Sequence, residues 1–187
     1  MSTITHHRPK LPFISLAPVR QRLQGRQYNI ALYLYMALVA GHFIEHIIQL
    51  IQLYVLHMPR AMSMGILGLY LPGLMRSEVL HFSYNLMQLL GLLLLAHGIS
   101  GQARPWWQAA IGLQCWHFFE HALLQGQWVY GRYLFGAPKQ VSIGELFLPR
   151  IELHFIYVTM VVIPTTIALY YHFASQQREK PTLSPAR

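Results

Sequence analysis

Apolar residues dominate four long stretches of the chain, and short polar or basic segments separate them. The stretches cover residues 28–56, 79–99, 106–127 and 153–173. A helix that crosses the hydrocarbon core of a bilayer needs about 20 mainly apolar residues, and each stretch reaches that length. The pattern therefore predicts an all-α integral membrane protein with four transmembrane helices.

The distribution of charged residues agrees with this prediction. Charged residues make up 11% of the chain, whereas soluble domains contain roughly 25%. Glu45 is the only charged residue in the first stretch and Glu120 the only one in the third, while 79–99 and 153–173 contain none. We therefore expect the bilayer to be a partner of this chain.

Basic residues flank the apolar stretches and indicate an orientation. With four crossings both tails share one side with the 100–105 loop, and that side holds the larger group of basic residues: Arg8, Lys10, Arg20, Arg22, Arg26, Arg104, Arg178, Lys180 and Arg187. The opposite side holds Arg60, Arg76, Arg132, Lys139 and Arg150. The excess predicts a multi-pass protein of the inner (plasma) membrane with both termini in the cytoplasm. The net charge of +8 then serves orientation and contact with anionic head groups, and we expect no nucleic-acid partner.

The two halves of the sequence resemble each other. His42, Glu45 and His46 recur 75 residues later, and the same offset relates three further pairs: Phe43 and Phe118, Gln52 and Gln127, and His97 and His172. The stretch LYLPGLMRSEVLHF (69–82) also resembles LFLPRIELHF (146–155). We predict two duplicated helix–loop–helix halves, related by a pseudo-two-fold axis along the membrane normal.

These patterns divide the chain into four parts. A basic cytoplasmic tail (1–27) precedes a first membrane repeat (28–99) and a second (100–175), and a cytoplasmic tail (176–187) follows. The outer connections of the repeats contain the apolar runs MGILGLYLPGLM and VYGRYLFG, which predict short helices at the membrane surface. Cys115 is the only cysteine, so no disulfide framework exists and packing is its expected role.

Ionisable residues inside the predicted spans form polar stripes, because residues three and four apart share a face of a helix. Glu152 and His154 depart from this spacing: they are two apart, and they converge only if Glu152 lies in an irregular turn after Pro149. All stripes fall in the outer half of the bundle. The candidate ligands are His42, Glu45, His46, Glu78, His81, His117, Glu120, His121, Glu152 and His154.

Burial of such groups in hydrocarbon costs roughly 2.5–3.5 kcal/mol each, so they normally have partners. The candidates outnumber the ligands of one tetrahedral zinc ion and suit two divalent metal ions bridged by carboxylates. Glu78-x-x-His81 resembles the Glu-x-x-His element of ferritin-like dimetal bundles. Iron is the favoured metal, with copper and zinc as alternatives. Second-sphere hydrogen bonds are expected from Gln49, Asn85, Gln88 and Gln125.

Several alternatives remain open for these residues. Glu78 and Glu152 each follow an arginine by two residues, so interfacial salt bridges with Arg76 and Arg150 also account for them. The whole constellation also fits a polar or proton-conducting network, or a bis-histidine haem. The methionines of HMPRAMSMG (57–65) could bind Cu(I) and transfer it inward. The favoured interpretation is that they pack as flexible apolar side chains in a helix at the interface.

The function predicted from these features is a membrane-embedded dimetal oxidoreductase. Its substrate would be oxygen or a lipophilic molecule such as a quinone, a lipid or a small hydrocarbon. The alternative is a non-enzymatic metal-handling or electron-transfer subunit of a membrane complex, with other subunits or further copies of the chain as partners. The sequence contains no phosphate-binding loop, nucleotide fingerprint or nucleophilic triad, so nothing supports a hydrolase or an NTPase.

Overall fold

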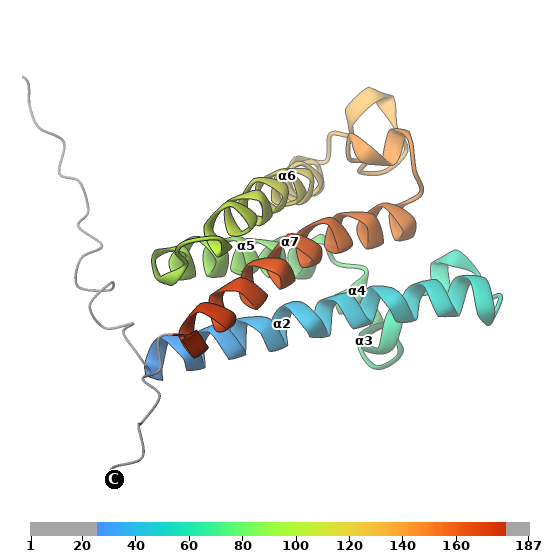
Figure 1. Ribbon diagram of the computed structural model, residues 1–187. Helices are drawn as coiled ribbons and strands as arrows, with labels where there is room; N and C mark the ends of the chain where they lie inside the picture. Colours follow the sequence, from blue (N-terminus) through green and yellow to red (C-terminus); the bar gives the residue numbers. More distant parts are fainter. Residues whose placement is uncertain (1–25, 179–187) are drawn as a thin grey trace, which may run out of the picture.

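The structure is a computed structural model, which describes residues 26–178. These residues form helices and connections without a strand, which confirms the predicted all-helical class. The four long helices are α2 (Arg26–Leu50), α5 (Glu78–Leu95), α6 (Ala103–Tyr130) and α7 (Arg150–Arg178), and they coincide with the four predicted stretches (Figure 1). Of the predicted cytoplasmic tails, 1–27 and 176–187, residues 1–25 and 179–187 lie outside the described residues, and the remaining positions belong to α2 and α7.

Two of the long helices change geometry where they end. Helix α2 continues as a π-helix over Ile51–Val55, and α5 continues as a 3-10 helix over Ala96–Gly98. With these extensions, three helices are long and apolar enough to cross a membrane: Gln27–Val55, Glu78–Gly98 and Arg150–Gln177.

Helix α6 is long but, unlike the other three, is not apolar enough to qualify as a candidate span. Its 28 residues span about 42 Å at 1.5 Å per residue, which exceeds the thickness of a bilayer core. Its composition is less apolar because it carries His117, Glu120, His121 and several glutamines. A fourth crossing therefore stays a prediction, as does the duplication of the two halves.

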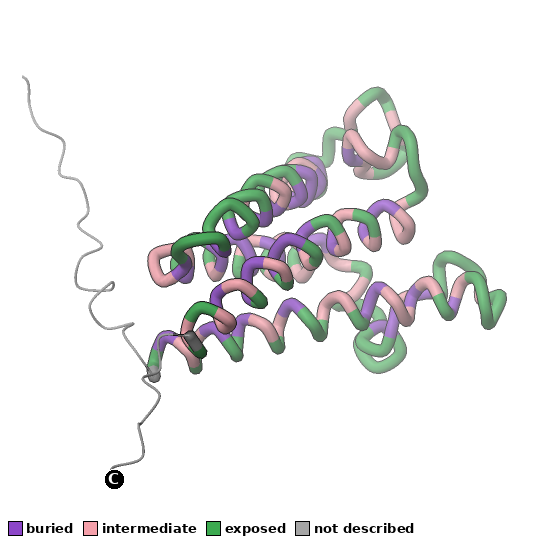
Figure 2. Tube along the Cα trace, viewed as in Figure 1, coloured by how far each residue is buried: buried purple, intermediate pink, exposed green. Residues whose placement is uncertain are grey.

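Exposed residues lie along all the long helices (Figure 2), and many of them are large and apolar. Leu34 is 68% exposed, Ile163 53% and Leu93 49%, although each lies within a long helix. Water-soluble proteins rarely expose apolar surface on this scale. Such faces are typical of helices that contact lipid.

Short helices occupy both outer connections, as the apolar runs predict. They are η2 (Arg60–Met62), α3 (Gly65–Tyr70) and α4 (Pro72–Met75) in the first connection, and η4 (Leu134–Gly136) and η5 (Gly144–Leu146) in the second. The start of α2 and the end of α7 lie together at the opposite end of the bundle (Figure 1). The outer connections therefore share one end, and their placement at a membrane surface stays a prediction.

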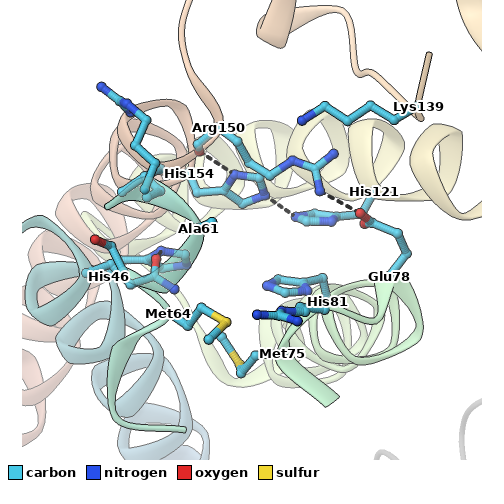
Figure 3. A pocket seen from close by; sticks show the side chains of 15 residues that line it. His46, Ala61, Met64, Met75, Glu78, His81, His121, Lys139, Arg150 and His154 are labelled. Carbon is cyan, nitrogen blue, oxygen red and sulfur yellow. Dashed lines mark hydrogen bonds and ion pairs between the residues drawn. The ribbon is translucent and has the colours of Figure 1, made fainter. Parts of the chain in front are cut away.

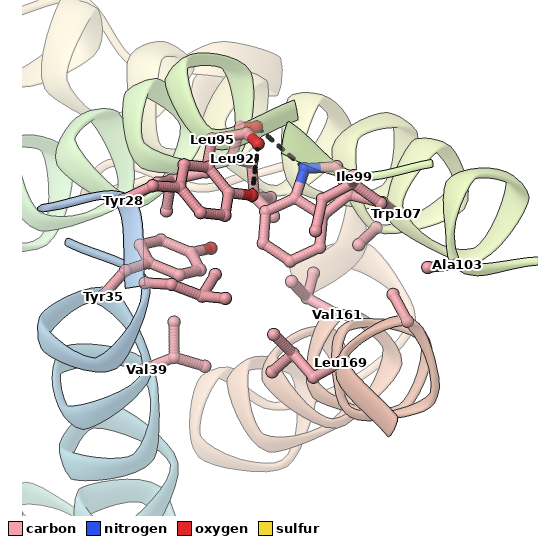
Figure 4. Close-up of a cluster of buried hydrophobic side chains, with 13 residues drawn as sticks. Tyr28, Tyr35, Val39, Leu92, Leu95, Ile99, Ala103, Trp107, Val161 and Leu169 are labelled. Atoms are coloured by element: carbon pink, nitrogen blue, oxygen red, sulfur yellow. Dashed lines mark hydrogen bonds between the residues drawn. The ribbon is translucent and has the colours of Figure 1, made fainter. Parts of the chain in front are cut away.

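The apolar core fills the end of the bundle at which α2 begins and α7 ends (Figure 4). Tyr28, Leu32, Tyr35 and Val39 repeat every three or four residues and so share one face of α2. They pack with Leu92, Leu95, Ile99, Ala103, Trp107, Ala110, Val161, Ala168 and Leu169. The Tyr28 hydroxyl and the Trp107 Nε1–H donate to the carbonyl oxygens of Leu95 and Leu92, both at 2.9 Å.

A buried amide layer follows the apolar core along the bundle axis. Asn85 and Gln114 are 0% exposed, and Gln114 Nε2 donates to Asn85 Oδ1 at 3.0 Å. Asn85 Nδ2 in turn donates to the carbonyl oxygen of His81 at 2.9 Å. The layer connects α5 with α6 and leads to the histidines beyond it.

Replacement of Trp107 by alanine tests the core. Trp107 is 1% exposed, so Trp107→Ala leaves a cavity and is expected to lower the free energy of unfolding by about 3–5 kcal/mol. Its neighbour Trp106 is 41% exposed and provides the matched control, because Trp106→Ala removes the same side chain from the surface. Unfolding of both variants in detergent is the measurement. Equal losses of stability would contradict the packing described above.

Candidate metal centre

The six candidate histidines lie together near the end of the bundle that carries the outer connections. The ring centroid of His46 lies 4.5 Å from that of His42 and 5.8 Å from that of His154. His121 lies 4.9 Å from both His117 and His154, and His81 lies 5.8 Å from His121. The four long helices therefore bring all six imidazoles into one continuous group, called here the histidine cluster.

Three members of the cluster have the geometry of a metal site. One nitrogen each of His117, His121 and His154 lies within 4.8 Å of the others, and all three side chains are buried. His121 Nε2 is 3.2 Å from His117 Nε2 and 3.1 Å from His154 Nε2. Nitrogens bound at about 2.0–2.1 Å to a tetrahedral metal lie about 3.3–3.4 Å apart, so these three imidazoles can hold a metal ion.

The first half of the chain contains a matching pair. His42 Nε2 and His46 Nε2 are 3.2 Å apart on α2, the same separation that His117 and His121 have on α6. In both pairs the two residues are four apart, so one turn of helix places their rings on the same face. The ring centroid of His81 on α5 lies 5.8 Å from that of His121 and 6.1 Å from that of His154, and His81 also lines a cavity together with His42 and His46.

Hydrogen bonds at Nδ1 orient three of the rings. His154 Nδ1 donates to the carbonyl oxygen of Arg150 at 2.7 Å, and His81 Nδ1 donates to that of Ser77 at 3.3 Å. His46 Nδ1 donates to Gln49 Oε1 at 2.9 Å. Since each acceptor is a carbonyl oxygen, each Nδ1 carries the hydrogen, and Nε2 presents a lone pair. Histidines that ligate metals are commonly held in this way.

His121 Nε2 cannot form good hydrogen bonds with all of its nitrogen neighbours. His121 Nε2 faces two other Nε2 atoms, and a single N–H cannot make a linear hydrogen bond to both. A cation bound between the three nitrogens would satisfy all of them. Nδ1 of His117 and of His121 is buried without a hydrogen-bond partner in the described part of the chain, so the protein does not orient these two rings as it does the other three.

Two of the four candidate glutamates bind backbone amides of the outer connections. Glu45 Oε1 accepts a hydrogen bond from the Leu67 N–H at 2.7 Å. Glu120 accepts from the Gly144 N–H, with Oε1 at 3.3 Å and Oε2 at 3.1 Å. At Gly65, where φ is +74°, a Cβ would lie 2.2 Å from Glu45 Oε1, so only glycine permits this approach. Both carboxylates thus hold a connection over the cluster.

The other two glutamates form ion pairs with arginines. The buried Glu78 accepts from Arg150 Nη1 at 2.6 Å, and the same guanidinium donates to Glu145 from Nε at 2.5 Å. Glu152 accepts from Arg60 at 2.6 and 2.7 Å, which raises the pKa of the Arg60 guanidinium, and it also bonds the Tyr54 hydroxyl. Salt bridges therefore do form, but with partners distant in sequence rather than with the arginine two residues earlier.

Equivalent glutamines anchor both outer connections. Gln52 accepts from the Gly65 N–H at 2.8 Å and donates to the Gly65 carbonyl oxygen at 3.2 Å. Gln127 accepts from the Val141 N–H at 3.3 Å and donates to the Val141 carbonyl oxygen at 2.8 Å. The contacts of Gln52 thus recur at the residue 75 positions later.

A cavity of about 360 Å³, called here the polar cavity, lies between the cluster and the outer connections (Figure 3). Its wall contains four cluster residues, His46, His81, His121 and His154, together with Gln49 and Glu78. Towards the connections the lining is basic and consists of Arg60, Arg76, Lys139 and Arg150. Of the three methionines in the 57–65 segment, only Met64 lines this cavity.

Some residues of the site were not among the candidates. Tyr84 stacks on His42 with ring centroids 4.2 Å apart, and the Tyr157 ring lies tilted against His117 with centroids 5.1 Å apart. Each tyrosine follows a cluster histidine by three residues, a spacing that places it on the same helix face. That spacing was the available signal. Arg150 could not be found in this way, because its partner Glu78 is 72 residues away.

Comparison of the chain with protein-family models, with curated proteins and with solved structures found no match. The site is therefore interpreted from its own geometry.

Removal of the guanidinium that pairs with buried Glu78 tests the ion pairs. Arg150→Met leaves Glu78, which is 4% exposed, without its cation, and is expected to cost about 3 kcal/mol of unfolding free energy. Arg60→Met is the control, because Arg60 is 50% exposed and such pairs contribute about 0–1 kcal/mol. Unfolding by titration with sodium dodecyl sulfate is the measurement. A larger loss of unfolding free energy for Arg60→Met than for Arg150→Met would contradict the assignment of Arg150–Glu78 as the stronger ion pair.

Proposed function

We propose that this chain is a membrane protein of four transmembrane helices whose histidine cluster binds two metal ions. Each predicted half supplies three imidazoles, His42, His46 and His81 from the first and His117, His121 and His154 from the second. The observation that carries the proposal is the close approach of His117, His121 and His154, whose ligand nitrogens lie within 4.8 Å of one another.

The orientation of the rings supports a small ion over the alternatives. Three rings donate Nδ1–H to carbonyl oxygens, which leaves their Nε2 lone pairs available to bind a cation. Neighbouring ring centroids lie 4.5–6.1 Å apart, so the imidazoles contact one another and leave little room for a porphyrin between them.

The ligand set differs from the carboxylate-rich one that the spacing suggests. Glu45 and Glu120 accept backbone amides, while Glu78 and Glu152 pair with arginines. The nearest ligands are therefore imidazoles, which bind iron, copper and zinc. Metal analysis decides between these three.

The charge of the polar cavity supports resident metal ions rather than metal traffic. Its lining contains Arg60, Arg76, Lys139 and Arg150. Arg60 and Arg150 are neutralised by Glu152, Glu78 and Glu145, so Arg76 and Lys139 supply the remaining positive charge. An excess of positive charge repels free cations on their way to the cluster and does not hinder neutral molecules such as dioxygen. This favours a cofactor in an oxidoreductase over the metal-handling alternative.

The proposed activity is the oxidation of a lipid-soluble substrate by dioxygen. Such a reaction balances when the two hydrogen atoms that the substrate loses, for example from the two O–H groups of a quinol, appear in hydrogen peroxide. The bound metal ions would supply the redox chemistry. Gln49 and the carbonyl oxygens of Ser77 and Arg150 would orient the ligands.

Metal content of purified variants tests the proposal. Wild type is expected to contain two metal ions per chain, and His121→Ala and His46→Ala are each expected to lose one, because each removes a ligand from one half. His97→Ala and His172→Ala are the controls, since both histidines lie against Tyr28 at the other end of the bundle. Elemental analysis is the measurement.

Two results would overturn the proposal. One is a wild-type protein that carries no metal after preparation without chelators. The other is full metal content in both His46→Ala and His121→Ala. Absence of oxygen consumption with a lipid-soluble donor, in protein that holds both ions, would overturn the enzymatic part alone.

A further inference from the structure

A second cavity reaches the histidine cluster from the side of the bundle, between α2 and α5. It measures about 470 Å³ and is called here the apolar cavity. Its lining is largely apolar and includes Ala37, Leu38, Ile44, Ile66, Leu67 and Leu80. Its inner wall is formed by His42, Glu45, His46 and His81, so one end is polar and the other is hydrocarbon.

The mouth of this cavity opens on the apolar outer surface of the bundle. Ile44 is 52% exposed, Leu67 48% and Ile66 46%, and all three line the cavity. If α2 and α5 cross the membrane as proposed, this surface faces lipid rather than water. A molecule dissolved in the bilayer would enter here without passing the basic polar cavity.

The opening depends on a difference between the two predicted halves at one position. Gly41 precedes His42 on α2, and Trp116 precedes His117 on α6, 75 residues later. Trp116 Nε1 donates to the Tyr157 hydroxyl at 3.1 Å, so its indole bridges α6 and α7 beside the cluster. At Gly41 a Cβ would meet no atom within 4 Å, and the corresponding space beside Tyr84 forms part of the apolar cavity.

We infer that the apolar cavity is the binding site for the lipid-soluble substrate, which enters sideways between α2 and α5 through the gap at Gly41. The inference rests on the proposed function, because it names the site at which that substrate meets the cluster. The substrate is a molecule with a single hydrocarbon tail and a head that carries carbonyl or hydroxyl oxygens. The tail lies along Ile44, Ile66 and Leu80, and the head reaches His42 and His81.

The chemistry of the inner wall selects this head group. Imidazole nitrogens and the Glu45 carboxylate form hydrogen bonds, and a pure hydrocarbon would bury them without partners. A head with two or more charges would have to leave water to cross the apolar mouth. A neutral oxygen-bearing head avoids both costs, and the volume suits a small ligand.

Photolabelling of variants tests the inference. The probe is a decyl-benzoquinone with a diazirine in its tail, added to protein in lipid nanodiscs. In wild type, adducts are expected to concentrate on residues 37–44 and 80–84, and unlabelled decylubiquinone is expected to displace them. Gly41→Trp, which copies the second half of the chain, is expected to reduce these adducts at least tenfold.

Matched variants keep the result interpretable. Gly112→Trp is the control, because Gly112 is an exposed glycine of α6 whose Cβ would also meet no atom within 4 Å, and its labelling should equal that of wild type. Trp116→Gly should open the second half and create new adducts near Tyr157. This gain of labelling does not depend on the folding of Gly41→Trp.

Three results would overturn the inference: labelling that Gly41→Trp leaves unchanged, adducts spread evenly over all lipid-facing helices, or displacement by decane as effective as by decylubiquinone. The last result would mean that the cavity takes any hydrocarbon chain. Metal content is measured on the same preparations, so loss of the ions reports failure of the proposed function, whereas labelling independent of Gly41 in metal-loaded protein reports failure of this site.

Discussion

A hydrogen bond from Nδ1 to a carbonyl oxygen determines what the buried histidine cluster can do. His46, His81 and His154 each donate this bond, to Gln49, Ser77 and Arg150 respectively. The ring then has one remaining polar atom, the lone pair on Nε2, which in His46 and His154 faces the Nε2 of another imidazole. Buried lone pairs without partners are costly, so a structure that gathers them favours a cation among them.

The carboxylates have a different part in the same arrangement. Glu45 and Glu120 hold the backbone of the two outer connections, and Gln52 and Gln127 hold the same connections about two turns further along their helices. The connections are thereby fixed over the cluster, where their basic residues line the polar cavity. A carboxylate that accepts backbone amides satisfies their hydrogen bonds and fixes the position of the loop.

Helix periodicity and residue spacing predicted much of this structure. The four apolar stretches match the four long helices to within a few residues, and the i, i+4 spacing of His42 with His46 and of His117 with His121 predicted pairs that share a face. The partners of the glutamates could not be predicted, because they depend on contacts between distant segments. Arg150 reaches Glu78 across 72 residues, and the amides of Leu67 and Gly144 become donors only once the connections fold back. Glu152 and His154 illustrate both cases: α7 is regular from Arg150, so their spacing of two directs Glu152 to Arg60 and His154 to the cluster.

The resemblance between the halves makes their differences informative. The histidine pairs, the glutamates and the anchoring glutamines make corresponding contacts at residues 75 positions apart, which supports the predicted duplication. Equivalent ligands from two halves suit a site in which the metals are alike. The proposed substrate, however, needs only one entrance to the cluster. A second entrance would expose the buried nitrogens to lipid or water without a function. Closure of one half by Trp116 and Tyr157, with Gly41 left open in the other, is therefore the asymmetry that the proposed function and the predicted duplication together would require.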